Sequence, residues 1–236
     1  MKKLILKLYM VFIIGNFGTV QLMAQLPKIN STINETEINK AIKEALNNGI
    51  NKQVSKLASK DGFLKNEVVK IMLPPELKIV DKKLRQLGMG KLADEGIALL
   101  NRAAEDAVKE ATPIFVDAIK QLRFSDAKNI LMGNNSSATT YLQNTTTTSL
   151  YNKFNPVIKN SLSKVGADKI WQEIIKKYNT LPFIKKVNPD ITDYTTNKAM
   201  EGVFKMIAIE EKEIRTNLGA RNSSLLKRVF GLQDSN

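Results

Sequence analysis

The chain of 236 residues contains no cysteine and no histidine. Without cysteine there can be no disulfide, no thiolate metal site and no cysteine nucleophile. Without histidine there is no imidazole base, no Ser–His or Cys–His pair and no histidine-bound metal. An enzyme of this composition would depend on carboxylates, lysine, tyrosine or a metal held by oxygen atoms. The two absences therefore argue against an enzyme without excluding one, and we expect no cofactor.

Aromatic residues make up only 6% of the chain, but hydrophobic residues reach 43% and charged residues 25%, which is ordinary for a globular protein. The formal net charge is +13, and 30 of the 36 basic residues are lysine. A basic chain attracts nucleic acid, anionic lipid and acidic polymers. Charge alone also serves solubility, and a solvated, lysine-rich surface is the simpler interpretation.

The first 24 residues have three lysines, no acidic residue, an apolar run over 4–14 and an alanine at position 24. This pattern is typical of a secretory signal peptide, although an uncleaved anchor is an alternative. The apolar run is shorter than the ~20 residues that span a bilayer. We predict cleavage after Ala24, a flexible tether over 25–34 and no transmembrane span afterwards. Cleavage would remove three of the 36 basic residues and leave 33 against 23 acidic ones.

From residue 35 onward, apolar residues recur at three- and four-residue steps, as Ile38, Ile42 and Leu46 illustrate, and this spacing predicts amphipathic helices. Prolines at 113 and 156 should break or kink two of these helices. The prediction is an all-α fold, an irregular multi-helix bundle with proline-broken helices, in a single domain over 35–236. Asn34 or Thr36 should cap the first helix, and Asp190 should cap the last long one.

Two segments depart from the helical pattern. Residues 63–73 are partly β-branched and end at two prolines, which predicts an extended segment, packed in a groove between helices. Residues 134–148 are a low-complexity polar stretch, which favours a loop containing one helical turn. The next helix should then begin near Thr148, while 167–178 forms a separate helix.

Several blocks occur in a fixed order. They are DGFL at 61–64, LGMGK at 87–91, NRAAE at 101–105, PIFVDAI at 113–119, ATTYL at 138–142, LPF at 181–183 and KVNPD at 186–190. Together they resemble the bacterial DUF4197 family of exported proteins of unassigned function, over roughly 38–230. The resemblance implies a Gram-negative periplasmic or outer-membrane-associated setting and carries over no catalytic residue. This chain lacks the anchor cysteine of the many members that are lipoproteins.

The blocks supply a candidate ligand or partner site. It comprises Asn101, Arg102, Asp117, Asp126, Thr139, Thr140 and Tyr141. Arg102 could clamp a phosphate or carboxylate. It could instead pair with Glu105 three residues on, or reach Asp117 or Asp126 across a helix junction. The hydroxyls at 139–141 could bind an anion or a sugar, or simply cap a helix.

Two further clusters of charged residues can be interpreted either as binding sites or as ordinary solvated surface. Lysines at 176, 177, 185 and 186 flank Tyr178 and Phe183, an arrangement that can bind nucleic acid. Export argues against nucleic acid and favours anionic lipid or the phosphate groups of lipopolysaccharide, and a solvated patch is the simplest interpretation. The acidic residues at 210, 211 and 213, with Lys212 and Arg215, are predicted to form a solvated, paired helix face.

Three functions remain open. The leading one is a non-enzymatic exported protein that binds a partner at the cell envelope, either a protein or an anionic component. The second is a small-molecule or lipid carrier with a cleft near Arg102, Thr139, Thr140 and Tyr141. The third is a carboxylate-dependent hydrolase, which needs two carboxylates about 5–9.5 Å apart in one cleft.

Overall fold

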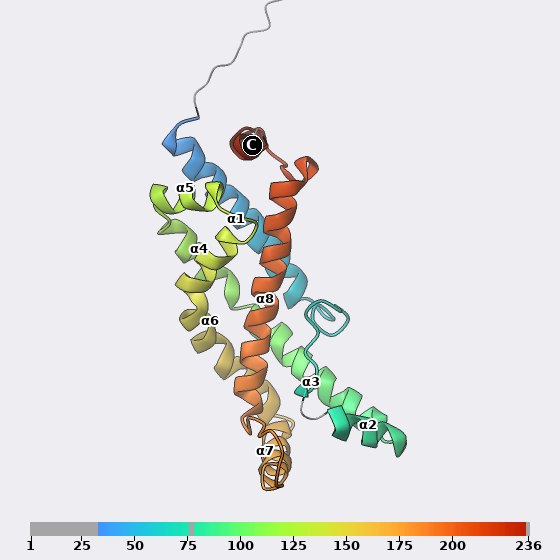
Figure 1. Ribbon diagram of the computed structural model, residues 1–236. Coiled ribbons are helices and arrows are strands. Elements are labelled where there is room, and N and C mark those ends of the chain that lie inside the picture. The colour runs from blue at the N-terminus through green and yellow to red at the C-terminus, as the bar shows by residue number, and fades with distance from the viewer. Residues whose placement is uncertain (1–32, 76–77, 235–236) are drawn as a thin grey trace, which may run out of the picture. The chain divides into compact units, whose positions relative to one another are not determined.

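The computed structural model describes residues 33–75 and 78–234 (Figure 1). The helices are α1 (Glu35–Ala58), α2 (Lys78–Gln86), α3 (Gly90–Val108), α4 (Ala111–Lys120), α5 (Phe124–Met132), α6 (Ser137–Ser163), α7 (Ala167–Tyr178), α8 (Ile191–Thr216), η2 (Leu218–Ala220), α9 (Ser224–Phe230) and η3 (Gly231–Gln233). No strand occurs among these described residues, so the predicted all-α class is confirmed. The predicted leader over 1–24, and the tether up to residue 32, lie outside them.

The two predicted helix caps are present. The Asn34 side chain accepts a hydrogen bond from the Glu37 backbone N–H at 2.9 Å, and the Glu37 carboxylate accepts one from the Asn34 N–H, which completes a capping box. At α8 the Asp190 carboxylate accepts from the N–H groups of Thr192 and Asp193. These bonds satisfy backbone donors that have no partner inside the helix.

Proline acts differently at its two predicted positions. The break expected near 111–112 is found, since α3 ends at Val108 and α4 begins at Ala111. Pro113 then lies in the first turn of α4, where a missing N–H costs nothing. Pro156, by contrast, lies inside α6, and the helix continues through it.

The polar stretch at 134–148 is the main correction to the predicted elements. Helix α6 begins at Ser137, so most of the stretch is helical rather than a loop. The hydroxyls of Thr145, Thr146 and Thr147 each donate to the carbonyl four residues earlier, at 2.6 to 2.8 Å. One side of the helix is buried at every fourth residue: Ala138, Leu142, Thr146, Leu150, Phe154, Ile158 and Leu162. Tertiary packing of this stripe overrides the low helical preference of threonine.

The core lies where α1, α3, α4, α6 and α8 meet. Helix α8 packs beside α6 and also against α1 and α3 (Figure 1). Phe115 of α4 and Phe204 of α8 stack edge to face, with ring centroids 6.1 Å apart. Gly49 allows α1 to approach α8 closely, because a Cβ there would lie 3.2 Å from Glu210 Cγ. Gly49 thus marks a close contact between these two helices.

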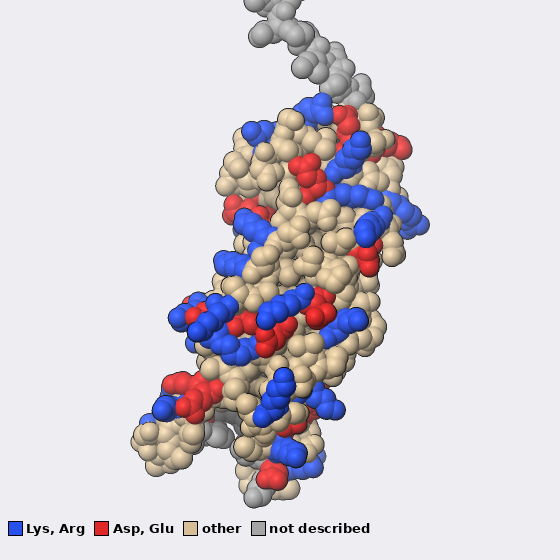
Figure 2. Space-filling view, turned by 180° about the vertical axis from the view of Figure 1, so that it is seen from behind, with Lys and Arg blue, Asp and Glu red and all other residues tan. Residues whose placement is uncertain are grey.

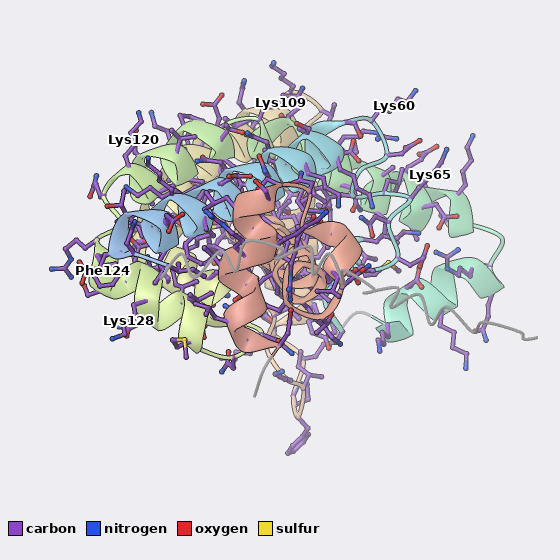
Figure 3. The ribbon with its side chains drawn as sticks, turned by 90° about the horizontal axis from the view of Figure 1, so that it is seen from above. Lys60, Lys65, Lys109, Lys120, Phe124 and Lys128 are labelled. Carbon is purple, nitrogen blue, oxygen red and sulfur yellow. The ribbon has the colours of Figure 1, made fainter. Side chains whose placement is uncertain are left out.

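The surface carries mixed charge. Basic and acidic side chains are interspersed on the face seen from behind (Figure 2). Lysines point outward around the rim of the molecule seen from above (Figure 3). Of those labelled, Lys65, Lys109 and Lys120 each pair with an aspartate. Along residues 33–75 and 78–234, none of the helices combines the length and the apolar character needed to cross a membrane.

Candidate functional site

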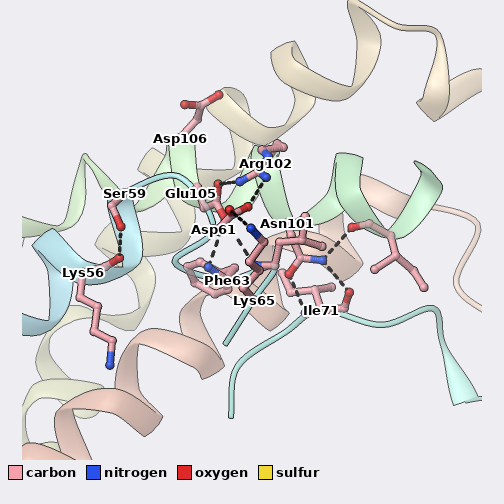
Figure 4. A network of polar contacts seen from close by, with 12 residues as sticks. Lys56, Ser59, Asp61, Phe63, Lys65, Ile71, Asn101, Arg102, Glu105 and Asp106 are labelled. Atoms are coloured by element: carbon pink, nitrogen blue, oxygen red, sulfur yellow. Dashed lines mark hydrogen bonds and ion pairs between the residues drawn. The ribbon is translucent and has the colours of Figure 1, made fainter. Parts of the chain in front are cut away.

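Arg102 lies in a cluster of two carboxylates (Figure 4). Its guanidinium donates to Glu105 Oε2 at 2.5 Å and, through its other terminal nitrogen, to Asp61 Oδ1. Asp61 also pairs with Lys65 at 2.9 Å. The predicted Arg102–Glu105 pair therefore exists. The second partner is Asp61, in the turn after α1, and neither Asp117 nor Asp126.

Glu105 holds the segment that follows α1. One oxygen of its buried carboxylate accepts the backbone N–H groups of Phe63 at 3.1 Å and Leu64 at 3.3 Å, and the other oxygen accepts from Arg102. Phe63 is fully buried against α8, where a Cβ on Gly202 would come within 2.7 Å of its ring. The carboxylate thus satisfies backbone donors and fixes Phe63 in the core.

Asn101 has the same role and lies one turn earlier on α3. Its side-chain oxygen accepts the Ile71 N–H at 2.8 Å, and its amide nitrogen donates to the Ile71 carbonyl at 2.8 Å. The amide is completely buried, and its pairing mimics that of a neighbouring strand. Residues 70–74 are accordingly neither helix nor turn and lie against α3 and α8, so the last part of the segment predicted as extended is confirmed. Residues 63–65 and 67–69 form turns, and the prediction of an extended segment over the whole of 63–73 is wrong there.

Attraction between opposite charges further stabilises the cluster around Arg102. The hydrogen bond from Arg102, followed by that from Lys65, lowers the pKa of Asp61 from 3.8 to about 2. The same carboxylates raise the pKa of Arg102, with Asp61 the larger cause. Asp61 also adopts φ +69°, a left-handed conformation that aspartate tolerates better than most residues. Asp61 is therefore ionised throughout the physiological range.

Two predicted carboxylates lie elsewhere. Asp117 is exposed on α4 and pairs with Lys120 at 3.2 Å. Asp126 accepts the backbone N–H of Arg123 at 3.0 Å and pairs with its side chain, so it caps the start of α5. Neither contacts Arg102, and the seven predicted residues do not converge on one point.

Asp117 and Tyr141 nevertheless share a groove. Tyr141 is half-buried, and its hydroxyl donates to the Ala118 carbonyl at 3.4 Å. The pKa of the Tyr141 hydroxyl is raised, and burial is the largest cause. The groove has a volume of about 460 Å³ and lies between α4 and α6. It is lined by Ile114, Asp117, Ala118 and Gln121 from one side and Tyr141, Thr145, Ser149, Asn152 and Lys153 from the other.

Thr139 belongs to a separate buried network that sequence analysis missed. Glu211 of α8 accepts from the N–H groups of Ala138 and Thr139 and from the Thr139 hydroxyl, all at 2.8 to 2.9 Å. Arg215 pairs with Glu211 and donates to the carbonyls of Ile130 and Leu131. The expectation of a solvated face is therefore wrong for this pair. Thr140, next to Thr139, points to solvent.

A sequence signal for the buried pair did exist. Position 211 follows the apolar residues Val203 and Ile207 at four-residue steps, and Ile214 comes three residues later, so it lies on the buried stripe of α8. Arg215, four residues on, stands directly beside it. A second buried arginine, Arg221, pairs with Asp234 and donates to the carbonyls of Ile214 and Arg215. No feature of the surrounding sequence predicted that Arg221 would be buried.

Room for metals and apolar ligands is small in the described region of the chain. Among residues 33–75 and 78–234, no three acidic side chains gather closely enough to hold a metal ion. The apolar cavity between α1, α5 and α8 measures about 30 Å³. That volume suits a water molecule rather than a lipid chain.

The family model described as "Protein of unknown function (DUF4197)" matches residues 32–231. The match covers nearly all of the described chain and agrees with the resemblance carried by the ordered sequence blocks. No curated protein and no solved structure matches the chain. The comparisons thus assign no activity, and any function has to be argued from the surfaces.

Proposed function

We propose that this chain, which belongs to the DUF4197 family, is an exported, non-enzymatic protein that binds a polar component of the cell envelope in the groove between α4 and α6. The observation that carries the proposal is the lining of this groove. Two residues of the predicted site, Asp117 and Tyr141, meet there and nowhere else. The signal-like first 24 residues support export.

The groove offers polar groups with free hydrogen-bonding capacity. Among the described residues, the side chains of Gln121, Ser149 and Asn152 have no hydrogen-bonding partner, and each can donate and accept. Lys153 and Asp117 add one charge of each sign. Ile114 and the Tyr141 ring also line the groove and give it apolar surface beside these polar groups. Hydroxyl, amide and both charges in one open groove suit a glycan or a short polar peptide better than a lipid.

Asp61 and Glu105 are two carboxylates that lie close together, as the hydrolase alternative requires, but their contacts stabilise the fold. Asp61 and Glu105 are both bound by Arg102, and Glu105 also accepts two backbone N–H groups. With a pKa of about 2, Asp61 has no proton to donate near neutral pH. Asp61 therefore cannot act as a general acid, and both oxygens of Glu105 already accept hydrogen bonds, which favours the binding function.

The carrier alternative draws no comparable support. Arg102 and Tyr141, which would share its cleft, make different contacts on α3 and α6. The apolar cavity of about 30 Å³ admits no fatty acyl chain. The polar groove is open, so it would hold a ligand at the surface rather than enclose it.

A titration followed by amide NMR tests the proposal, with soluble peptidoglycan fragments as the probe. We expect shift changes confined to α4 and α6, and loss of binding in Ser149→Trp, which fills the groove. Thr148→Trp is the matched control, because Thr148 is the adjacent exposed residue and does not line the groove. Equal binding by both variants would refute the assignment of the groove.

A further inference from the structure

The loop after α7 presents apolar side chains to solvent. Phe183 is fully exposed and Leu181 is 54% exposed. Both stand on residues 180–186, which join α7 to the approach to α8. The fold has a buried apolar cluster directly beneath, formed by Ile175 and Val187 with Trp171 packed against it. The chain places its Phe and Leu outside that cluster rather than in it.

The base of this loop is pinned. The Asn179 side chain accepts the Val187 N–H at 2.9 Å and donates to the Val187 carbonyl at 2.8 Å. The Trp171 indole N–H donates to the Asn188 carbonyl at 3.4 Å. These bonds close residues 180–186 into a projecting loop with fixed ends. A fixed loop loses little conformational entropy when it docks.

Phe183 is also in an unusual backbone conformation, with φ +59°. A bulky residue is rarely found in the left-handed region, where glycine is the usual choice. Backbone strain of this kind concentrates at binding sites. Here the strain holds an aromatic side chain away from the core, after Pro182, which itself restricts the chain.

The charge around the loop is positive. Residues 164–189 contain six lysines and two acidic residues. Lys176 on α7 and Lys186 on the loop are exposed. Three of the five lysines labelled in Figure 3 differ, because Lys65, Lys109 and Lys120 are each paired with an aspartate. An excess of lysine beside a protruding apolar tip matches the surface of an anionic bilayer.

We propose that residues 180–186 dock the protein onto a bilayer that contains anionic phospholipid. Phe183 and Leu181 enter the region below the headgroups, and Lys176 and Lys186 lie at the level of the phosphates. A bilayer accepts a convex apolar tip without a complementary pocket, which a protein partner would have to supply. The proposal is independent of the groove between α4 and α6, and either can fail alone.

Co-sedimentation with vesicles of phosphatidylcholine, with and without phosphatidylglycerol, tests this docking. We expect binding only to the anionic vesicles. Phe183→Ser should weaken it about tenfold or more. Lys176→Gln with Lys186→Gln should weaken it about fivefold per lysine and reduce its dependence on salt. Leu218→Ser is the matched control, because Leu218 is 64% exposed just beyond the other end of α8.

A second measurement locates the tip directly and does not depend on whether residues 1–24 remain attached. With Trp171 retained, the emission of Phe183→Trp should be quenched by brominated anionic lipid more strongly than that of the native protein, whose one tryptophan is Trp171. Absence of this additional quenching overturns the proposal. So does equal loss of binding in the Phe183 and Leu218 variants, or undiminished binding without Phe183. Equal binding to neutral vesicles contradicts the role of the lysines and also overturns it.

Discussion

Replacing Glu211 by glutamine should lower the free energy of unfolding by about 3–4 kcal/mol. The carboxylate accepts five hydrogen bonds, three from the start of α6 and two from Arg215. Glutamine keeps one acceptor oxygen and turns an NH₂ group towards these donors. Arg215 then retains a buried charge without its counterion. Only 4% of the Arg215 side chain and 6% of the Glu211 side chain are exposed, so solvent screens this loss weakly.

Urea denaturation followed by circular dichroism measures the change. Glu213→Gln is the matched control on the same helix, because Glu213 is exposed and its carboxylate accepts only a 3.4 Å contact from Asn217. Its free energy of unfolding should stay within about 0.5 kcal/mol of the native protein. If the Glu211 and Glu213 variants unfold at the same urea concentration, the buried network does not hold α6 to α8, and the reasoning fails.

Two further predictions concern the segment after α1. Because the pKa of Asp61 falls from 3.8 to about 2 on folding, its charge adds stability above pH 4 that disappears as the pH drops towards 2. Urea midpoints should therefore show the advantage of the native protein over Asp61→Asn shrinking across that window, and a pH-independent difference would contradict it. Gly202→Ala should cost about 1–3 kcal/mol, because the new Cβ would lie 2.7 Å from the Phe63 ring. Gly96→Ala, where nothing lies within 4 Å of the new Cβ, should instead stabilise α3 by up to about 1 kcal/mol. Thermal unfolding of the two variants tests both predictions. Equal changes in their melting temperatures would refute the close approach of Gly202 to Phe63.

Sequence patterns correctly predicted the helices that are determined by residues close together in the chain. The helix over 167–178 has the predicted bounds, and the last long helix begins after Asp190 as its capping chemistry requires. The Thr-rich start of α6 could not be predicted this way. Thr146 supplies the buried position between Leu142 and Leu150, and only packing against the rest of the core shows that a threonine completes that stripe.

The candidate site was less predictable, because its contacts join distant segments of the chain. The pairing of Arg102 with Glu105 spans three residues and was foreseen as an alternative, whereas its bond to Asp61 spans 41. The groove that unites Asp117 and Tyr141 depends on how α4 packs on α6. Burial of Glu211 depends in the same way on α6 beginning beside α8. Spacing along one helix describes its faces and cannot say what covers them.

Native mass spectrometry of the protein, purified gently from its own cell envelope, tests the central claim most directly. The account predicts a co-purifying polar mass that is retained in Thr148→Trp and lost in Ser149→Trp. The ligand released from the protein should have the same mass as the ligand that was bound, because the protein binds it without converting it. A bound mass that survives in Ser149→Trp, or one that is released as a cleaved product, would contradict a non-catalytic binding site in the groove between α4 and α6.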